Sequence, residues 1–364
     1  LAFTSVAVSQ MTVGTLLASA ALAASLVVVL WRRRWYAIEP FAIVACYAVH
    51  WLWLRQVFEA LGGHKPFPEF PASAALLTFY WAVWMASFFL REERDAATQR
   101  LLTASFLLNA AGYLAVLHYQ SLYPHLRFWF LLGTGATYLA LSPLGKRLGR
   151  RLAFVLTSTF GAVLLAAAIP YRYSGARLEI VWLVQAEAFL VVGWRLAESH
   201  LRKLGWAAAG ALTIYVTLHD LSPRLDQWKP PDIAMGLMLL TLAAGFYLNA
   251  RLAPRLLREQ AVETDTASAT ASYAAATGWL LAAVWLAVPH VWVGLVWAAL
   301  ALALGEIGRR WNDAMLRGCA HGAALLAALR LLTINLQIAP ELYGISTRAL
   351  TVGAGVALFY LASR

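Results

Sequence analysis

Apolar stretches of about 20 residues recur along the whole chain, and short polar or charged connections separate them. The hydrocarbon core of a bilayer is roughly 30 Å thick, which takes about 20 apolar residues in an α-helix. Runs such as LLASAALAASLVVVLW do not alternate as a transmembrane β-strand must, so the pattern predicts helices and excludes a barrel. We predict an all-α polytopic membrane bundle with 13 spans at about 11–31, 35–54, 72–90, 99–118, 126–142, 151–170, 178–196, 204–221, 233–250, 272–288, 291–307, 315–336 and 346–362.

Composition agrees with a membrane protein and argues against two other classes. Apolar residues make up 61% of the 364 residues and charged residues 13%, whereas soluble domains carry about 25% charged residues. The basic residues sit in short connections rather than on a basic arm, so the net charge of +11 does not predict a nucleic-acid partner. Cys46 and Cys319 lie in apolar context, which is typical of small buried side chains rather than of a disulfide framework.

The distribution of basic residues predicts the topology. Of the 29 Lys and Arg residues, 19 fall on odd-numbered connections and 8 on even-numbered ones. The positive-inside rule places the odd connections in the cytoplasm, with Leu1 outside and Arg364 inside, and we expect the bacterial cytoplasmic (inner) membrane. Because the chain begins at Leu1 without a visible signal peptide and its last span ends almost at Arg364, we expect a segment of a longer polytopic protein.

Two segments, 164–195 and 280–310, share one pattern at an offset of about 115–119 residues. In each, an apolar helix ends in a proline, a short turn and a Val-Trp pair follow, and a glycine and an arginine close the next helix. The offset equals four spans, an even number, so the pattern predicts a parallel repeat about an axis along the membrane normal. Spans two to five are candidates for a third, eroded copy.

The repeats divide the chain into four expected parts. Residues 1–150 form an N-terminal transmembrane region, and 151–258 and 272–364 form two transmembrane repeats. Between the repeats, the segment EQAVETDTASATA (259–271) is polar and low in complexity, which is typical of a linker and here predicts a cytoplasmic one.

Glu187 is the most anomalous residue, because it lies at the centre of span seven. A carboxylate at that depth is costly and normally faces a partner or a water-filled cavity. Glu187 is therefore a candidate for a proton relay or for a polar contact to a substrate, and the alternative is a hydrogen bond between two helices. Trp182 and Gln185 on the same predicted helix are further binding candidates.

Two arginines complete the set of binding candidates. Arg330 lies in span twelve, about six residues from its predicted outer end. It either extends its stem to the outer interface, or pairs with Glu187, or binds an anionic headgroup. Arg195 closes span seven and is either part of a site or an ordinary cytoplasmic anchor; it is about 12 Å along the axis from Glu187.

Histidines gather toward the predicted outer face, but their spacing is not that of a metal site. The adjacent pair His219 and Asp220 is the one weak catalytic candidate, and histidines without a catalytic role at the interface are the alternative. No nucleotide-binding, serine-hydrolase or zinc-protease motif is present, and we expect no metal and no cofactor. The outer-face histidines are His50, His64, His118, His125, His219 and His290, with Glu69, Asp220, Asp226 and Asp232 nearby.

One part of the chain resembles a known family. The run AIPYRYSGARLEIVWLVQAEAFLVVGWRL, followed by LRKLGW and TLHDL, is similar to the bacterial "domain of unknown function 2339" family of predicted membrane proteins. The resemblance is specific over about 150–220 and departs from the family in the second copy, where Leu302 replaces the central glutamate. It implies a large multi-pass bacterial protein of unassigned activity. The matching positions are Trp182, Glu187, Gly193, Arg195 and Asp220.

Three functions fit these observations. The first is transporter-like or flippase-like handling of a lipid or envelope precursor, the second is an outer-face transferase acting on a lipid-linked substrate, and the third is a non-catalytic scaffold subunit. Expected partners are membrane lipids and other membrane subunits. A wet cavity at mid-membrane favours transport, an outer pocket holding His219 and Asp220 favours an enzyme, and neither favours a scaffold.

Overall fold

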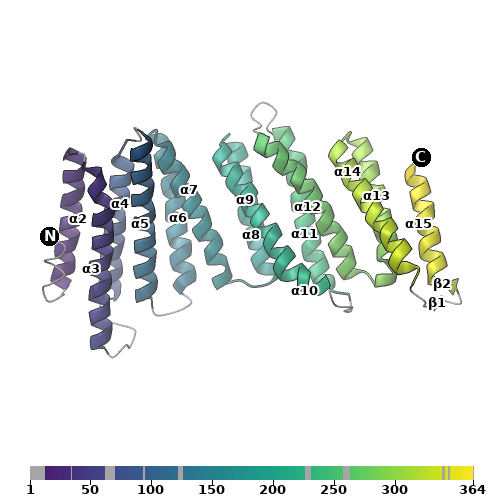
Figure 1. Ribbon diagram of the computed structural model, residues 1–364, viewed down its shortest axis with the longest axis horizontal. Helices are drawn as coiled ribbons and strands as arrows, with labels where there is room; N and C mark the ends of the chain where they lie inside the picture. The colour runs from purple at the N-terminus through teal and green to yellow at the C-terminus, as the bar shows by residue number, and fades with distance from the viewer. Residues whose placement is uncertain are drawn as a thin grey trace. The chain divides into compact units, whose positions relative to one another are not determined.

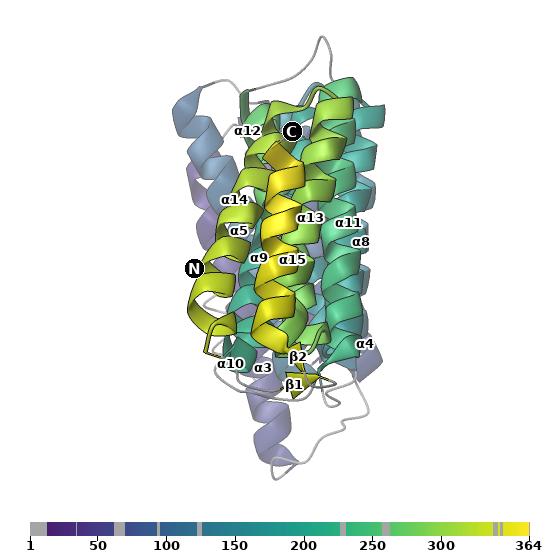
Figure 2. The same cartoon turned by 90° about the vertical axis from the view of Figure 1, so that its right-hand side faces the viewer.

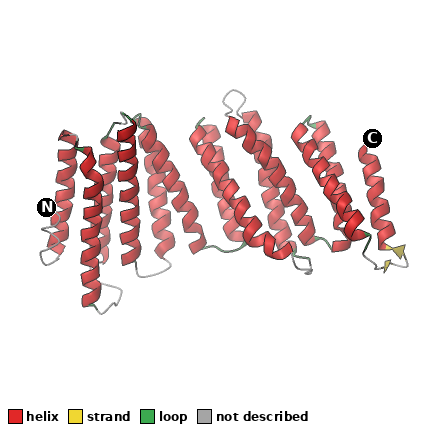
Figure 3. Cartoon of the chain, in the orientation of Figure 1, coloured by secondary structure: helices red, strands yellow, loops and turns green. Residues whose placement is uncertain are grey.

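The computed structural model of the chain describes residues 13–33, 35–61, 70–92, 95–121, 126–225, 231–256, 263–337, 341–342 and 345–363. Within these residues the fold is helical apart from one short antiparallel hairpin, Glu341–Leu342 (β1) with Ile345–Ser346 (β2) (Figure 3). This confirms the all-helical class. Each of the 13 predicted spans overlaps one long helix.

Contacts divide the chain into two compact units, Leu1–Arg172 (unit 1) and Tyr173–Arg364 (unit 2). In unit 2, consecutive helices lie side by side in antiparallel pairs (Figure 1). In unit 1, α6 and α7 pair in this way, whereas α2 packs mainly on α4, and α3 mainly on α5. The described elements of unit 1 are α2 (Val13–Arg33), η1 (Tyr36–Ile38), α3 (Glu39–Ala60), α4 (Phe70–Leu90), α5 (Ala96–Gln120), α6 (Leu126–Arg147), α7 (Arg151–Ala168) and η2 (Ile169–Tyr171).

Unit 2 is a row of helical hairpins. The turn that joins α8 to α9 and the turn that joins α13 to α14 lie at the same end of the unit, while α10 and the β-hairpin lie at the opposite end (Figure 1). Its elements are α8 (Ala176–Arg195), α9 (Ser199–Tyr215), η3 (Val216–Leu221), α10 (Ser222–Leu225), α11 (Ile233–Leu256), α12 (Glu263–Ala287), α13 (His290–Arg310), α14 (Ala314–Arg330), η4 (Leu331–Asn335) and α15 (Thr347–Ser363).

Nine helices within the described residues are long and apolar enough to cross a membrane. This supports a multi-pass membrane protein. Among the other long helices, α9 and α15 have only 17 residues, and α8 carries two carboxylates, Glu179 and Glu187. The nine are Gly14–Arg33, Tyr36–Ala60, Phe70–Leu90, Ala96–Gln120, Arg151–Tyr171, Ile233–Leu252, Asp265–Ala287, His290–Arg310 and Ala314–Asn335.

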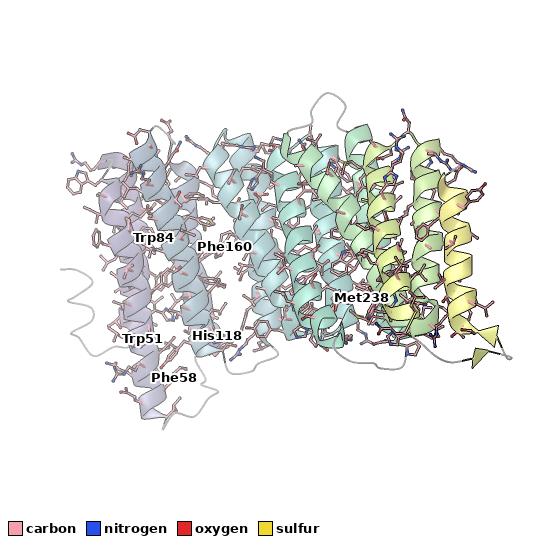
Figure 4. The ribbon with its side chains drawn as sticks, turned by 45° about the vertical axis from the view of Figure 1, so that its right-hand side comes forward. Trp51, Phe58, Trp84, His118, Phe160 and Met238 are labelled. Carbon is pink, nitrogen blue, oxygen red and sulfur yellow. The ribbon has the colours of Figure 1, made fainter. Side chains whose placement is uncertain are left out.

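Large aromatic side chains fill the core of unit 1, and polar side chains pair inside it. Trp84 on α4 is buried among these helices (Figure 4), and the hydroxyl of Tyr47 donates to Oδ1 of Asn109 at 2.7 Å. The hydrogen bond between Tyr47 and Asn109 offsets the cost of burying these two polar groups. At the start of α3, buried Glu39 forms an ion pair with Arg91 and accepts a hydrogen bond from Ser87.

One turn recurs three times, in the connections α6–α7, α8–α9 and α13–α14. The backbone carbonyl of a glycine in the last turn of the first helix accepts a hydrogen bond from the backbone N–H five residues later. The residue four positions after that glycine has a positive φ. This is the left-handed helix ending for which glycine and asparagine are favoured. The three glycines are Gly145, Gly193 and Gly308, and their positive-φ followers are Gly149 (69°), Ala197 (53°) and Asn312 (50°).

Part of the expected linker is helical. Residues 263–271 are the first turns of α12, whereas 259–262 lie outside the described residues. A tertiary contact lies in these turns: Asp265 is buried and lies 3.1 Å from Nε of Arg202 on α9. The expected boundaries at 151 and 272 stay predictions.

Candidate functional site

Two carboxyl groups meet at the end of the α8–α9 hairpin that lies opposite its turn. Glu179 is in the first turn of α8, and Asp220 is in η3, directly after α9. Because α8 and α9 are antiparallel and joined at their other ends, the start of α8 lies beside the end of α9. The two side chains are almost completely buried, with Glu179 1% and Asp220 7% exposed.

The carboxyl groups of Glu179 and Asp220 are close neighbours inside the hairpin. An ionised carboxylate only accepts hydrogen bonds, so a bond between two carboxyls requires that one of them carry a proton. Among the described residues, Oε2 of Glu179 and Oδ2 of Asp220 have no hydrogen-bond donor when both groups are ionised. A proton held between the two groups would supply that donor, which makes the pair a candidate proton-binding site.

One guanidinium faces this pair and a third carboxylate. Nη1 of Arg224 on α10 lies 3.5 Å from Oδ1 of Asp220, and Nε of Arg224 lies 3.8 Å from Oδ2 of Asp232. Arg224 also donates to the backbone carbonyl of Asp220. Three carboxyl groups against one fixed cation leave an excess of negative charge, which a bound proton reduces.

An exposed histidine lies beside the carboxyl pair, and two aromatic rings pack next to it. Nδ1 of His219 lies 3.4 Å from Oδ2 of Asp220, and the His219 side chain is 66% exposed. Its ring stacks on Tyr215 with centroids 4.9 Å apart, and Tyr215 in turn meets Trp182 edge to face at 4.9 Å. The sequence candidates Trp182, His219 and Asp220 therefore come together at one end of unit 2. An exposed imidazole beside a buried carboxyl can pass a proton to it.

The backbone at Asp220 is π-helical, since η3 (Val216–Leu221) continues α9 with wider turns. Single π turns inside α-helices occur frequently at functional sites. A second π segment, η4, continues α14 in the same way. The wide turn places two successive polar side chains, His219 and Asp220, at the end of the hairpin.

Glu187 is half-buried in the middle of α8 and bonds to a neighbouring helix. Nδ2 of Asn249 on α11, which is itself buried, donates to Oε1 of Glu187 at 2.5 Å. Glu187 follows Glu179 by eight residues, or about 12 Å along the helix axis. The predicted pairing of Glu187 with Arg330 is not what the structure shows, because the amide of Asn249 supplies the partner.

Arg330 lies in an aromatic clamp instead. Its guanidinium carbon is 4.2 Å from the ring centroid of Trp285 and 5.7 Å from that of Trp297. Nη2 donates to the backbone carbonyl of His290 at 3.1 Å, and the residue is only 4% exposed. One sequence-based alternative was that the Arg330 stem extends to the outer interface. The buried side chain does not do so. Cation–π contact and one carbonyl stabilise this buried charge.

The remaining sequence candidates lie apart from the carboxyl pair. Arg195 is exposed in the last turn of α8, at the end of that helix opposite Glu179. Gln185 lies between Glu179 and Arg195 along α8 and is half-buried. His50 is buried in unit 1, where its Nε2 lies 2.8 Å from Oγ of Ser73. His64, Glu69, His125 and Asp226 fall outside the described residues. No group of three or more metal-ligating side chains occurs in the part of the chain that the structure describes.

Sequence reasoning missed Glu179 and Arg224. Glu179 was hidden because a carboxylate near a helix end is usually solvated, and only the hairpin brings it beside Asp220. The available signal was the order of elements: a carboxylate three residues into α8 and another just past α9 must meet when the two helices are antiparallel neighbours.

Comparisons of the chain with protein-family models, with curated proteins and with solved structures gave no match. Fold and composition define the class as a polytopic α-helical membrane protein.

Proposed function

We propose that this chain is a 13-span bacterial inner-membrane protein with transporter-like or flippase-like function, in which protonation of the Glu179–Asp220 pair drives the handling of a lipid or envelope precursor. The observation that carries the proposal is a buried pair of neighbouring carboxyls in which one oxygen of each group has no hydrogen-bond partner among the described residues. A shared proton would provide the missing donor. Ionisable groups inside membrane helices commonly mark proton and substrate pathways.

Topology supports a role in proton entry. By the distribution of Lys and Arg, residue 1 is outside and residue 364 is cytoplasmic, which puts the pair at the outer end of α8. Glu187 on the same helix then lies deeper in the membrane and is the second station of a relay. The resemblance to the "domain of unknown function 2339" family and the four-helix parallel repeat remain part of this proposal.

The test uses purified protein in proteoliposomes that contain a fluorescent phospholipid. The rate of phospholipid exchange between leaflets is measured with and without a proton gradient. We expect the gradient to accelerate exchange for the unaltered protein and to have no effect in E179Q or D220N, which hold no shared proton. The matched control is E59Q, because Glu59 is an exposed carboxylate paired with Arg55 in unit 1.

The outcomes separate the proton site from the lipid activity. Gradient-independent exchange in the unaltered protein would refute proton coupling, and absence of exchange would refute a flippase-like role. Infrared difference spectroscopy tests the site by itself, because the protonated carboxyl band should disappear in E179Q and D220N but persist in E59Q. Persistence of the band in both pair variants would show that no proton is shared there.

A second function is favoured by the exposed His219 beside Asp220. A histidine oriented by a carboxylate is a general base, and in an outer-face transferase it would activate a hydroxyl acceptor for attack on a lipid-linked donor. H219Q separates the two functions. Transfer requires the imidazole and should fall by about 10²–10⁴-fold, whereas proton binding by Glu179 and Asp220 should survive.

A further inference from the structure

Arg330 carries a buried positive charge that the described residues do not balance. The residue is 4% exposed, and its Nη2 donates to the backbone carbonyl of His290 at 3.1 Å. Nε and Nη1 are buried without a hydrogen-bond partner, and no carboxylate among the described residues forms an ion pair with the group. A guanidinium does not lose its proton inside a protein, so this charge persists.

Two tryptophan rings offset only part of the charge. The guanidinium carbon of Arg330 lies 4.2 Å from the ring centroid of Trp285 and 5.7 Å from that of Trp297, and the two rings are 5.9 Å apart. A ring face attracts a cation, but it supplies no formal negative charge. Enclosing an ion costs more than such contacts return unless a counter-ion is enclosed with it.

The start of α13 adds a second positive charge at the same place. The carbonyl that accepts from Arg330 belongs to His290, the first residue of α13, at the end of unit 2 that carries α10 and the β-hairpin (Figure 2). The N-terminus of a helix carries about half a positive charge. α13 begins after Pro289 with no side-chain cap and with no acidic residue in its first turn. Two positive groups therefore meet where a helix end favours an anion.

The equivalent place in the first hairpin carries the opposite charge. There the first turn of α8 holds Glu179, and Asp220 is its close neighbour. The residue that stands where the second hairpin has Arg330 is Tyr215, whose ring meets a tryptophan edge to face at 4.9 Å. The second hairpin thus keeps the tryptophan, lacks both carboxyls and gains a cation. The equivalent positions, all inside the two described hairpins and 115 residues apart, are Glu179 and Gly294, Trp182 and Trp297, Tyr215 and Arg330, and Asp220 and Asn335.

A carboxylate at this end of unit 2 is engaged elsewhere. The backbone N–H of Asp232 donates to a carbonyl in the last turn of α12. Its carboxylate, however, caps α11 by accepting from the backbone N–H of Met235 at 3.0 Å, and lies 3.8 Å from Nε of Arg224. Asp232 therefore balances Arg224 and not Arg330.

We infer that Arg330 and the N-terminus of α13 bind one small inorganic anion with the size and charge of chloride. Such an ion balances the guanidinium and the helix end together. The enclosure of Arg330 sets the size, because a ligand has to shed its water and fit beside Nε and Nη1. Each oxygen of a phosphate group also needs donors, whereas a halide needs few. The inference does not rest on the proton site at Glu179 and Asp220, so either can fail alone.

Thermal unfolding of the detergent-purified full chain tests the site when sodium chloride replaces sodium gluconate at constant ionic strength. We expect the melting temperature to rise with chloride and then to level off, because a ligand that binds only the folded state stabilises it by mass action. Broadening of the chloride NMR signal measures binding directly in the same samples. R147Q is the matched control, because Arg147 is an exposed helix-end arginine of unit 1 and should leave both signals unchanged.

R330M separates anion binding from a packing role. It keeps a long side chain beside the two tryptophans and removes the charge, so chloride affinity should fall at least about tenfold, as expected for loss of a charge-assisted contact. In gluconate, R330M should melt no lower than the unaltered chain, because an unbalanced buried charge has been removed. A role in cation–π packing alone predicts a lower melting temperature in both salts.

A second pair of variants supplies the anion from the chain itself, as α8 does. H290E puts a carboxylate on the first residue of α13, where acidic residues stabilise a helix, and should abolish the chloride dependence, whereas H290Q should keep it. Chloride dependence that is absent from the unaltered chain, or that survives in R330M and H290E, would overturn the inference. Stabilisation by phosphate or by phosphatidylglycerol but not by chloride would overturn it too, since the site would then recognise a phosphate group.

Discussion

Oδ1 of Asn335 lies 3.3 Å from the place that a Cβ on Gly294 would take. These two residues stand 115 positions after Asp220 and Glu179, at the same end of the second hairpin. The positions equivalent to the carboxyl pair therefore carry no carboxyl in the second hairpin, and Nδ2 of Asn335 donates instead to the carbonyl of Val291. The proton chemistry that we propose belongs to the first hairpin alone.

Substitutions of Glu187 distinguish a role in a proton relay from a role as a structural hydrogen-bond acceptor. In E187Q the side-chain oxygen still accepts from Asn249, so we expect thermal unfolding in detergent to be unchanged within about 0.5 kcal/mol. In E187L the buried Asn249 amide loses its partner, which should cost about 1–3 kcal/mol. If E187Q also leaves gradient-driven lipid exchange unchanged, Glu187 is a structural residue and the relay ends at Glu179.

Among the ion pairs of unit 2, we expect substitution of the buried pair Arg202 and Asp265 to lower the free energy of unfolding most. D265N leaves the buried Arg202 without its carboxylate and should lower the free energy of unfolding by about 3–5 kcal/mol, measured by denaturant titration. The double variant R202M/D265L removes both charges and should lose less than D265N. A loss in D265N no larger than in E59Q, an exposed pair, would contradict the buried assignment.

Gly145 tests the recurring turn. A Cβ at this position would lie 2.6 Å from the backbone nitrogen of Phe154, which cannot move without separating α6 from α7. G145A should therefore destabilise the protein by about 1–3 kcal/mol. Gly133 in the same helix is the control, since a Cβ there has nothing within 4 Å, and G133A should be neutral or stabilising by up to about 1 kcal/mol. Equal melting temperatures for the two variants would refute the close-approach argument.

Asp95 provides a pH-dependent contribution outside the membrane spans. Its side chain caps α5 by accepting from the backbone N–H of Thr98 at 2.6 Å, and this bond lowers the pKa of the Asp95 carboxyl below its usual value. A lowered pKa in the folded state means that the cap stabilises above the unfolded-state pKa and weakens as pH falls through the folded-state pKa. D95A should therefore melt below the unaltered protein at neutral pH, with a difference that shrinks in acid. D95N, which caps without ionising, should show no such pH dependence.

The apolar pattern was sufficient to locate the long helices, because a segment of membrane-spanning length leaves few alternatives to a helix. It does not reveal which side chains of distant helices meet. The polar start of α12 is paired with Arg202 through Asp265, and nothing within 259–271 signals that partner. Likewise, Glu187 was an evident anomaly, but its partner Asn249 is an uncharged residue that no charge count singles out.

The recurring turn also bears on the order in which this protein can assemble. Its hydrogen bonds join residues three to five positions apart, so the three hairpins that contain it can close from contacts that are local in sequence and form quickly. Nascent chains arrested after α9 should already show α8 crosslinked to α9, before α11 has been synthesised. Biogenesis can therefore proceed two helices at a time, and each completed hairpin gives the next one a surface to pack against in the bilayer.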